Sequence, residues 1–177
     1  MPSVVLLGCA GLVPQIFVSA FGTTRAAAGS FANQYALEHD LHLDLARAAK
    51  EAGCRVCVLV SSSSAHDRVP DFAYGRMKRG IEDGVRALGF ERTVILRPGV
   101  IQGQREEART GEGVAKVIIR GLGVVSPSLR DTLDQDAGVI AEAAVAVGVA
   151  SLEDAEVEAQ PRVRVIERSN ILEFATQ

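Results

Sequence analysis

Short aliphatic runs alternate with longer amphipathic stretches along most of this chain, and this alternation restricts the possible folds more than any other feature. Strand-like runs lie at 3–8, 15–21, 55–61, 92–97 and 162–167, and helical patterns at 31–52, 72–88, 114–121, 135–150 and 169–175. Such alternation is typical of βαβ units, in which parallel strands are joined by crossover helices. The sequence therefore predicts one α/β domain over residues 1–177, with a parallel sheet and flanking helices.

The helical stretches also indicate which faces should be buried. Gly53 and Gly89 follow the first two long helices and are suited to end them. The stretch 135–150 is apolar almost all round, so we expect it to be fully buried. In the first helix the expected core face comprises Leu37, Leu41, Leu45, Ala48 and Ala52, and in the second Tyr74, Met77, Ile81, Val85 and Leu88.

Charge and cysteine usage exclude several classes of protein. The net charge is −3 and the basic residues are scattered, which argues against a nucleic-acid partner. No apolar run reaches the roughly 18 residues of a membrane span, and the N-terminal run shows no cleavable targeting segment. Cys54 and Cys57 form a C-x-x-C. This spacing could indicate a redox pair, but residues 55–61 are predicted to form a strand, in which an odd separation places side chains on opposite faces. We therefore expect the two thiols on opposite faces, where they cannot bridge or share a metal. Cysteines without a framework indicate a reducing compartment.

Three polar residues form the clearest chemical pattern. Tyr74 and Lys78 are four residues apart on a predicted helix, so they share a face. Ser62 lies at the carboxyl end of the preceding strand, where parallel sheets bind ligands. A nearby ammonium lowers the pKa of a phenol, which lets it exchange a proton with a carbonyl or alcohol oxygen. The serine hydroxyl can hold the same oxygen, and a nicotinamide must supply the hydride.

Longer segments around these residues resemble a known family. The runs FVSAFGTTRAAAGS, EHDLHLDLARAAKEAG, VLVSSSSA, YGRMK, ALGFERTVILRPG and GQREEAR are similar to an atypical group of short-chain dehydrogenases/reductases. The group contains fungal mitochondrial-proteome proteins and the metazoan Tat-interacting oxidoreductase, and the resemblance covers roughly residues 15–170.

The resemblance implies a Rossmann fold that binds NADP(H) or NAD(H). It implies that Ser62 is the catalytic serine, with Ser61 as the alternative, that Tyr74 is the acid/base, and that Lys78 tunes Tyr74 and binds the nicotinamide ribose. It also implies that Pro98 and Gly99 lie beside the nicotinamide. Fungal members are associated peripherally with the outer mitochondrial membrane, and a cytoplasmic location is the expectation otherwise.

The dinucleotide-binding fingerprint is incomplete in this chain. Gly8 and Gly11 have its spacing and are candidate cofactor residues, but Pro14 stands at the third glycine position and no helix follows. The parts of the family fold between its first and fourth strands are missing from the pattern. A shortened protein and an incomplete gene sequence would both give this result, and weak cofactor binding is expected.

The two N-terminal strands cannot pair as they do in the family. Parallel neighbours need a crossover of roughly a dozen residues, and only residues 9–14 separate the runs 3–8 and 15–21. We therefore expect either an antiparallel hairpin or an N-terminal segment that lies elsewhere. Both leave a sheet edge poorly protected.

Several further residues are weaker candidates. Gly22 and Arg25 lie in a loop after a strand and could approach a cofactor phosphate, although a surface ion pair explains Arg25 equally well. His39 and His42 lack an evident third ligand, so we expect two solvated histidines and no metal site. Residues 105–107 could begin a solvated helix or contact substrate.

Two functional hypotheses follow. The first is a nicotinamide-dependent oxidoreductase for a small carbonyl or alcohol substrate, with activity impaired by the incomplete N-terminal part. The second is a non-catalytic interaction protein on a Rossmann-like scaffold at the mitochondrial surface, whose exposed edge favours a partner or a homodimer.

Overall fold

The computed structural model describes residues 4–7, 15–66, 72–102, 134–157 and 161–175. They form an α/β fold whose five-stranded sheet has the order β1-β2-β3-β4-β7. The strands are β1 (Val4–Leu7), β2 (Ile16–Ser19), β3 (Val56–Val60), β4 (Arg92–Arg97) and β7 (Arg162–Glu167). Strands β2, β3, β4 and β7 are parallel, which confirms the predicted Rossmann-like sheet.

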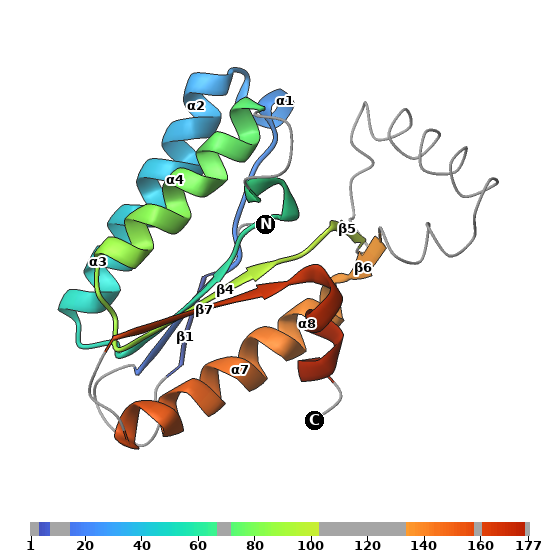
Figure 1. Cartoon of the computed structure of the whole chain (residues 1–177). Coiled ribbons are helices and arrows are strands. Elements are labelled where there is room, and N and C mark those ends of the chain that lie inside the picture. Colours follow the sequence, from blue (N-terminus) through green and yellow to red (C-terminus); the bar gives the residue numbers. More distant parts are fainter. Residues whose placement is uncertain (1–3, 8–14, 67–71, 103–133, 158–160, 176–177) are drawn as a thin grey trace.

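Helices cover both faces of this sheet (Figure 1). One face carries α2 (Phe31–Tyr35), the π-helix η1 (Ala36–Asp40), α3 (Leu41–Glu51) and α4 (Ala73–Ala87). The other carries α7 (Ala137–Val157) and α8 (Arg168–Ala175). Four short elements were not predicted: α1 (Arg25–Ala28), the 3-10 turn η2 (Ser63–Ala65), and the strands β5 (Val100–Gln102) and β6 (Asp134–Asp136), which pair with each other. The predicted helix at 114–121 and residues 105–107 lie outside the described residues.

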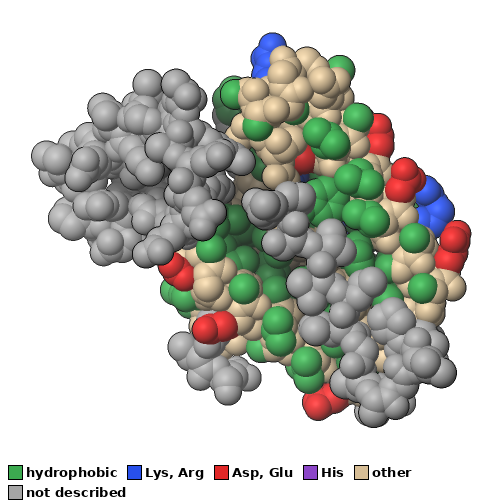
Figure 2. Space-filling view, turned by 180° about the vertical axis from the view of Figure 1, so that it is seen from behind, with side chains coloured by type: hydrophobic (Ala, Val, Ile, Leu, Met, Phe, Trp, Pro, Cys, Tyr) green, Lys and Arg blue, Asp and Glu red, His purple; other side chains and the backbone are tan. Residues whose placement is uncertain are grey.

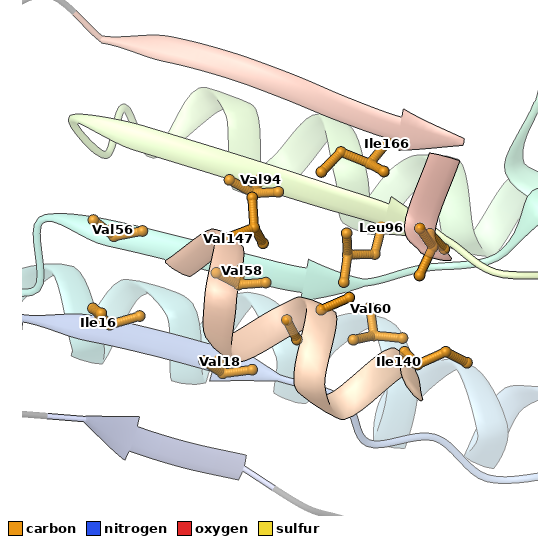
Figure 3. Packing of buried hydrophobic residues seen from close by; sticks show 13 residues of the cluster. Ile16, Val18, Val56, Val58, Val60, Val94, Leu96, Ile140, Val147 and Ile166 are labelled. Carbon is orange, nitrogen blue, oxygen red and sulfur yellow. The ribbon is translucent and has the colours of Figure 1, made fainter. Parts of the chain in front are cut away.

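Strand β1 runs antiparallel to β2, and in Figure 3 its arrow points opposite to the others. Val4 pairs with Ser19 and Leu7 with Ile16. This is the antiparallel alternative expected from the short spacing between the two runs. The direction of β1 also affects the dinucleotide-binding fingerprint, which includes the residues that follow β1 in the sequence. β1 ends beside the start of β2, at the amino edge of the sheet, while ligands of parallel sheets bind at the carboxyl edge.

Branched aliphatic side chains fill the space between the sheet and α7 (Figure 3). Alternate residues of each strand point to this face, as the two-residue period of a strand requires. Val58 and Leu96 are completely buried there against Val147 of α7. Each fully buried side chain of this size contributes about 1.5–3 kcal/mol to folding. The labelled members of this cluster are Ile16, Val18, Val56, Val58, Val60, Val94, Leu96, Ile140, Val147 and Ile166.

The long helix α7 is buried along one face rather than all round. Ile140, Ala143 and Val147 are buried, whereas Val145 and Val149 are 47% and 45% exposed. The prediction of a fully buried helix was therefore wrong, because α7 lies on the outside of the sheet and only one of its faces meets the strands. In Figure 2 hydrophobic side chains gather in the middle of the face shown, and charged side chains lie mostly toward its margin.

The expected core face of the first long helix was also wrong. Leu37 and Leu41 are 48% and 41% exposed, while Glu38 and His42 are buried. Hydrophobic periodicity alone placed the leucines inside. The polar side chains take the inner face, where Glu38 meets Thr23 of the loop after β2 and Lys78 of α4, and His42 stacks on Phe21 of the same loop. The core face of α4 was predicted correctly for Met77, Ile81 and Val85.

The two cysteines also differ from the expectation. Cys54 and Cys57 are free thiols buried in the same hydrophobic cluster, not on opposite faces. The strand rule does not relate them, because β3 begins only at Val56 and Cys54 lies in the turn before it. Burial raises the pKa of both thiols, so both are poor nucleophiles.

Candidate active site

Loops that follow β2, β3 and β4 meet at the carboxyl edge of the sheet. The three strands begin in register, with Ile16 opposite Val56 and Val56 opposite Arg92. Hydrogen bonds continue the β3–β4 ladder beyond the strands: the N–H of Ser61 donates to Leu96 O at 2.8 Å and that of Ser63 to Pro98 O at 2.8 Å. The edge therefore brings Ser62 next to Pro98, as their sequence positions after strands suggested.

Ser62 is the N-cap of the turn η2. Its Oγ accepts from Ser64 N at 3.2 Å and from Ser64 Oγ at 2.9 Å. Both bonds use lone pairs of the oxygen, so among the described contacts the Ser62 proton is still available to donate. A hydroxyl held in this way can donate to the oxygen of a substrate.

Ser61 is committed to a different network. It is buried, and its Oγ donates to Glu82 Oε1 at 2.7 Å. The same carboxylate accepts from Arg97 Nε at 3.0 Å and Nη2 at 2.7 Å, and from Arg86 Nη2 at 3.1 Å. This geometry favours Ser62 over Ser61 as the serine available to a ligand.

The first turn of α4 approaches the turn η2 very closely. An added Cβ on Gly75 would lie 2.6 Å from the carbonyl oxygen of Ser64. A side chain is therefore excluded there unless the backbone moves. Because Tyr74 precedes this glycine and Ser62 begins η2, the close contact brings the serine turn against the tyrosine end of the helix.

Tyr74 and Lys78 lie together, one turn apart on α4. The Lys78 ammonium is 5.6 Å from the centre of the Tyr74 ring, and Lys78 is 4% exposed while Tyr74 is 39% exposed. Burial raises the pKa of Tyr74, the Lys78 charge and hydrogen bond lower it, and the Glu38 charge raises it. Lys78 acts in the expected direction, but the net pKa is raised because burial is the largest effect.

A buried carboxylate on the π-helix joins the lysine to the loop after β2. Glu38 Oε2 lies 2.9 Å from Lys78 Nζ. Glu38 Oε1 accepts from the backbone N–H of Thr23 at 3.0 Å and from Gln34 Nε2 at 3.0 Å. An added Cβ on Gly22 would lie 3.4 Å from Glu38 Oε2. Gly22 therefore belongs to the same cluster as Lys78.

The candidate residues divide into two sets. Ser62, Tyr74, Lys78, Gly22 and the Pro98–Gly99 step lie along the carboxyl edge of the sheet. The fingerprint candidates Gly8 and Gly11 lie outside the described residues, although Leu7, which precedes them, is at the opposite edge. Arg25 begins the short helix α1, which is capped by the Thr24 side chain.

Of the two histidines, His42 is buried, contrary to expectation, whereas His39 is partly exposed and its Nδ1 lies 2.8 Å from Asp40 Oδ1. His42 stacks on Phe21 with ring centroids 3.7 Å apart, and its Nδ1–H donates to Glu38 O at 2.6 Å. Burial first, then the Lys78 charge, lowers its pKa to about 4, so it is neutral at pH 7. His39 stacks on Tyr35. The described residues contain no cluster of three ligands suited to a metal.

Sequence reasoning missed Gln34, Glu38 and Glu82 as parts of this region. Hydrophobic periodicity directs attention to the leucines, but Gln34, Glu38 and His42 recur every four residues and form a polar stripe on one helix face. Such a stripe was the available signal for a buried polar cluster. Nothing in the sequence distinguished Glu82, which is buried, from Asp83, which is exposed.

Comparison with known proteins shows the family. The chain is 59% identical over 140 residues to "Protein fmp52, mitochondrial" of Emericella nidulans, across 79% of this chain and 60% of the relative. It is 53% identical to the protein of that name from Aspergillus clavatus over 161 residues, across 91% of the chain and 68% of the relative. The chain belongs to the fmp52 family. The member from Coccidioides immitis is 48% identical over 160 residues.

This fmp52-family chain spans between 60% and 68% of the length of these first two relatives. No family model matches the chain. Within the described ranges, no helix has the length and apolar character needed to cross a membrane.

Proposed function

We propose that this fmp52-family protein is a short-chain dehydrogenase/reductase-like oxidoreductase that uses NADPH or NADH on a small carbonyl or alcohol substrate. The observation that carries the proposal is the Lys78 ammonium, buried 5.6 Å from the Tyr74 ring centre at the carboxyl edge of a parallel sheet. Ser62 lies at the same edge. A relation to the metazoan Tat-interacting oxidoreductase is part of the same proposal and rests on the sequence resemblance.

In this proposal Tyr74 is the proton donor and Ser62 holds the substrate oxygen. The raised pKa of Tyr74 keeps the phenol protonated at neutral pH, which suits donation to a carbonyl oxygen and so the direction of reduction. As negative charge develops on that oxygen, the Ser62 hydroxyl and the nearby Lys78 charge stabilise it. A bound nicotinamide would supply the hydride.

The nicotinamide end of the site fits such a cofactor. A lysine ammonium has three N–H donors. Lys78 Nζ lies 2.9 Å from Glu38 Oε2 and 5.6 Å from the centre of the Tyr74 ring, and in this proposal it also donates to a ribose hydroxyl. Gly22 and Thr23 lie at the same edge with backbone groups on the same cluster, and Pro98 and Gly99 follow β4.

The pyrophosphate end fits less well. β1 runs antiparallel and ends beside Ile16, which places the end of the strand at the amino edge of the sheet and not at the carboxyl edge. A helix N-terminus normally offers the pyrophosphate several N–H donors. Charge-assisted hydrogen bonds are worth about 1.5–3 kcal/mol each, so loss of two or three weakens binding by roughly three orders of magnitude or more. We therefore expect roughly millimolar affinity and slow turnover.

The test combines calorimetry with turnover. NADPH and NADH are titrated into the wild-type chain, and nucleotide oxidation is then followed with a small aldehyde or quinone. Tyr74→Phe should leave nucleotide affinity unchanged and lower turnover by about two orders of magnitude or more. The chain has two tyrosines, so Tyr35→Phe is the matched control and should keep wild-type turnover. Turnover that survives Tyr74→Phe contradicts the assignment, and micromolar binding by the wild type contradicts the expected weak affinity.

The alternative is a non-catalytic interaction protein on the same scaffold. Support for it comes from the antiparallel β1 at the sheet edge and the exposed valines Val145 and Val149 of α7. An unprotected edge and exposed apolar side chains favour association with a partner or a second copy. Concentration-dependent association in light scattering, with no nucleotide binding, favours this alternative over the oxidoreductase.

We also infer a mitochondrial location, because the relatives are named mitochondrial proteins. Peripheral attachment to the outer membrane rests on the sequence resemblance. Carbonate extraction of purified mitochondria tests it: the protein should be released to the supernatant, and protease added to intact organelles should degrade it.

A further inference from the structure

Glu38 is a deeply buried acidic group beside the proposed catalytic residue Lys78. Its side chain is 1% exposed and that of Lys78 is 5% exposed, and their charged atoms are 2.9 Å apart. Removing a carboxylate and an ammonium from water costs several kcal/mol per ion, so such a pair is weak evidence for stability alone. Its position next to Tyr74 suggests a different role.

The second oxygen of Glu38 faces the loop after β2. Oε1 accepts from the backbone N–H of Thr23 at 3.0 Å and from Gln34 Nε2 at 3.0 Å, and Gln34 Nε2 also donates to Thr23 O at 3.0 Å. One carboxylate thus binds the lysine through one oxygen and the loop through the other. Four elements meet at this group: the β2 loop, α2, η1 and α4.

The local backbone explains how the carboxylate reaches this point. Glu38 is the middle residue of the π-helix Ala36–Asp40, in which Leu41 N donates to Ala36 O. A π-turn inside an α-helix widens the backbone locally and is frequent at functional sites. Below it, His42 donates from Nδ1 to the carbonyl oxygen of Glu38 at 2.6 Å, which holds the widened turn in place.

We propose that Glu38 is a positioning residue of this site: presented by the π-helix, its buried carboxylate fixes the Lys78 ammonium beside Tyr74 and ties it to the Thr23 loop. The proposal deepens the proposed oxidoreductase function and rests on it for its catalytic meaning. A lysine side chain is a point charge on a flexible four-carbon stem, so its ammonium needs an anchor to stay at one place.

The Tyr74 phenol reports where the ammonium is. Lys78 lowers the pKa of Tyr74, whereas the negative charge of Glu38 raises it. Among the described residues these two charges act on the phenol, and they predict opposite results for Glu38→Gln. If Glu38 is only a neighbouring charge, the substitution lowers the Tyr74 pKa. If Glu38 holds Lys78 in place, the ammonium moves away and the Tyr74 pKa rises.

The experiment is a titration of tyrosinate absorbance in a Tyr35→Phe background, which leaves Tyr74 as the reporting tyrosine. We expect Glu38→Gln to raise the Tyr74 pKa by about one unit when Lys78 is present. In a Lys78→Met background the same substitution should lower it, because only the charge effect is left. Asp44→Asn removes an exposed carboxylate of α3 and should change nothing. A fall in both backgrounds overturns the proposal.

A second variant and a second measurement test the proposal in case Glu38→Gln does not fold. Glu38→Asp keeps the charge but shortens the side chain, so it should also raise the Tyr74 pKa, and an unchanged value overturns the proposal. Nitrogen-15 spectra of the lysine side chains, recorded at neutral pH, test directly whether Glu38 holds the Lys78 ammonium in place. The chain has three lysines, and Lys78→Arg identifies the Lys78 signal. This ammonium should exchange slowly with water in the wild type and at least about tenfold faster in Glu38→Gln; equal rates overturn the proposal.

Neither measurement uses a nucleotide. A wild type that binds and turns over no NAD(P)H therefore counts against the proposed function alone. A Glu38→Gln variant that keeps Lys78 in place counts against the positioning role alone, even where turnover is found.

Discussion

At the scale of single residues, buried polar side chains decide much of this structure. Glu38, His42, Lys78 and Glu82 are all buried, and sequence patterning placed none of the acidic ones inside. Each is held by specific partners, as buried charged groups must be. His42 is a special case among them because it is held neutral: its Nδ1 faces a carbonyl, and its Nε2 has no hydrogen-bond partner in the described part of the chain.

His42 should make the protein sensitive to mild acid. Its pKa is lowered from 6.5 to about 4 by burial and by Lys78, while backbone and side-chain groups of Glu38 partly oppose this. The unfolded chain then takes up this proton near pH 6.5 and the folded chain only near pH 4. The stabilisation is complete above pH 6.5 and is lost as pH falls toward 4, by about 3 kcal/mol in total.

The measurement is the free energy of unfolding by urea across this pH range. The comparison is His42→Asn. The asparagine amide can still donate to Glu38 O, but it does not titrate in this pH range. The variant should be less stable at neutral pH, since the stacking on Phe21 is lost, and it should show a smaller loss between pH 6.5 and pH 4. Equal losses in both proteins would show that His42 does not carry the effect.

At the scale of elements, helix α4 organises the site. One helix positions Tyr74 and Lys78 toward the carboxyl edge and Glu82 toward the strands. The helix is fixed at its start by the contact between Gly75 and the turn η2, and further along by Gly80, which faces the His39 ring of η1. The sequence pattern identified the helix and its end at Gly89, but gave no reason for these two glycines.

Alanine substitutions at the two glycines should therefore differ. In Gly75→Ala the new Cβ would lie 2.6 Å from the backbone carbonyl oxygen of Ser64. In Gly80→Ala it would lie 3.0 Å from Nε2 of the His39 ring, and this side chain can move slightly. Alanine favours helix by about 1 kcal/mol over glycine. We expect Gly75→Ala to destabilise by about 1–3 kcal/mol and Gly80→Ala to stay within about 1 kcal/mol of wild type. Chemical denaturation measures both, and equal stabilities would contradict the contact with η2.

At the scale of the whole molecule, the sheet is joined at its carboxyl edge by one polar network. Glu82 of α4 accepts from Ser61 after β3 and from Arg97 at the end of β4, and Arg97 Nη1 lies 3.0 Å from Glu167 at the end of β7. The network crosses three strands and one helix. It fixes the carboxyl ends of β3 and β4, where the loops that contain Ser62 and Pro98 begin.

Loss of the central carboxylate should affect global stability. Glu82→Ala leaves the Arg97 guanidinium and the Ser61 hydroxyl without their acceptor, which should cost about 3–5 kcal/mol. Asp83→Ala is the matched control, because Asp83 neighbours Glu82, also pairs with Arg86 and is exposed; it should cost less than about 1 kcal/mol. Urea denaturation compares them. Similar costs would show that the network does not hold the sheet edge.

The sequence predicted the strands well and the inner faces of the helices poorly. The boundaries of β3, β4 and β7 lie within one residue of the predicted runs. β3 and β4 each contain a continuous aliphatic run, as is typical of buried parallel strands, whereas β7 is an edge strand whose first three residues are exposed. The expected inner face of the first long helical stretch was wrong, because Leu37 of η1 and Leu41 of α3 are exposed. A hydrophobic pattern cannot show that Glu38 pairs with Lys78 and that His42 stacks on Phe21, because these partners lie far away in the sequence.

For the candidate site, the sequence by itself determined the residue types and their order: Ser62 after one strand, Tyr74 and Lys78 one turn apart, and Pro98 after the next strand. Helix and strand geometry follow from local spacing, so these relations did not need the fold. The tertiary structure alone decided that Lys78 faces Glu38, that Ser61 faces Glu82, and that β1 runs antiparallel. These depend on residues 40 and 21 positions apart or on the reversal of a strand, and long-range packing, not local sequence, selects among such pairings.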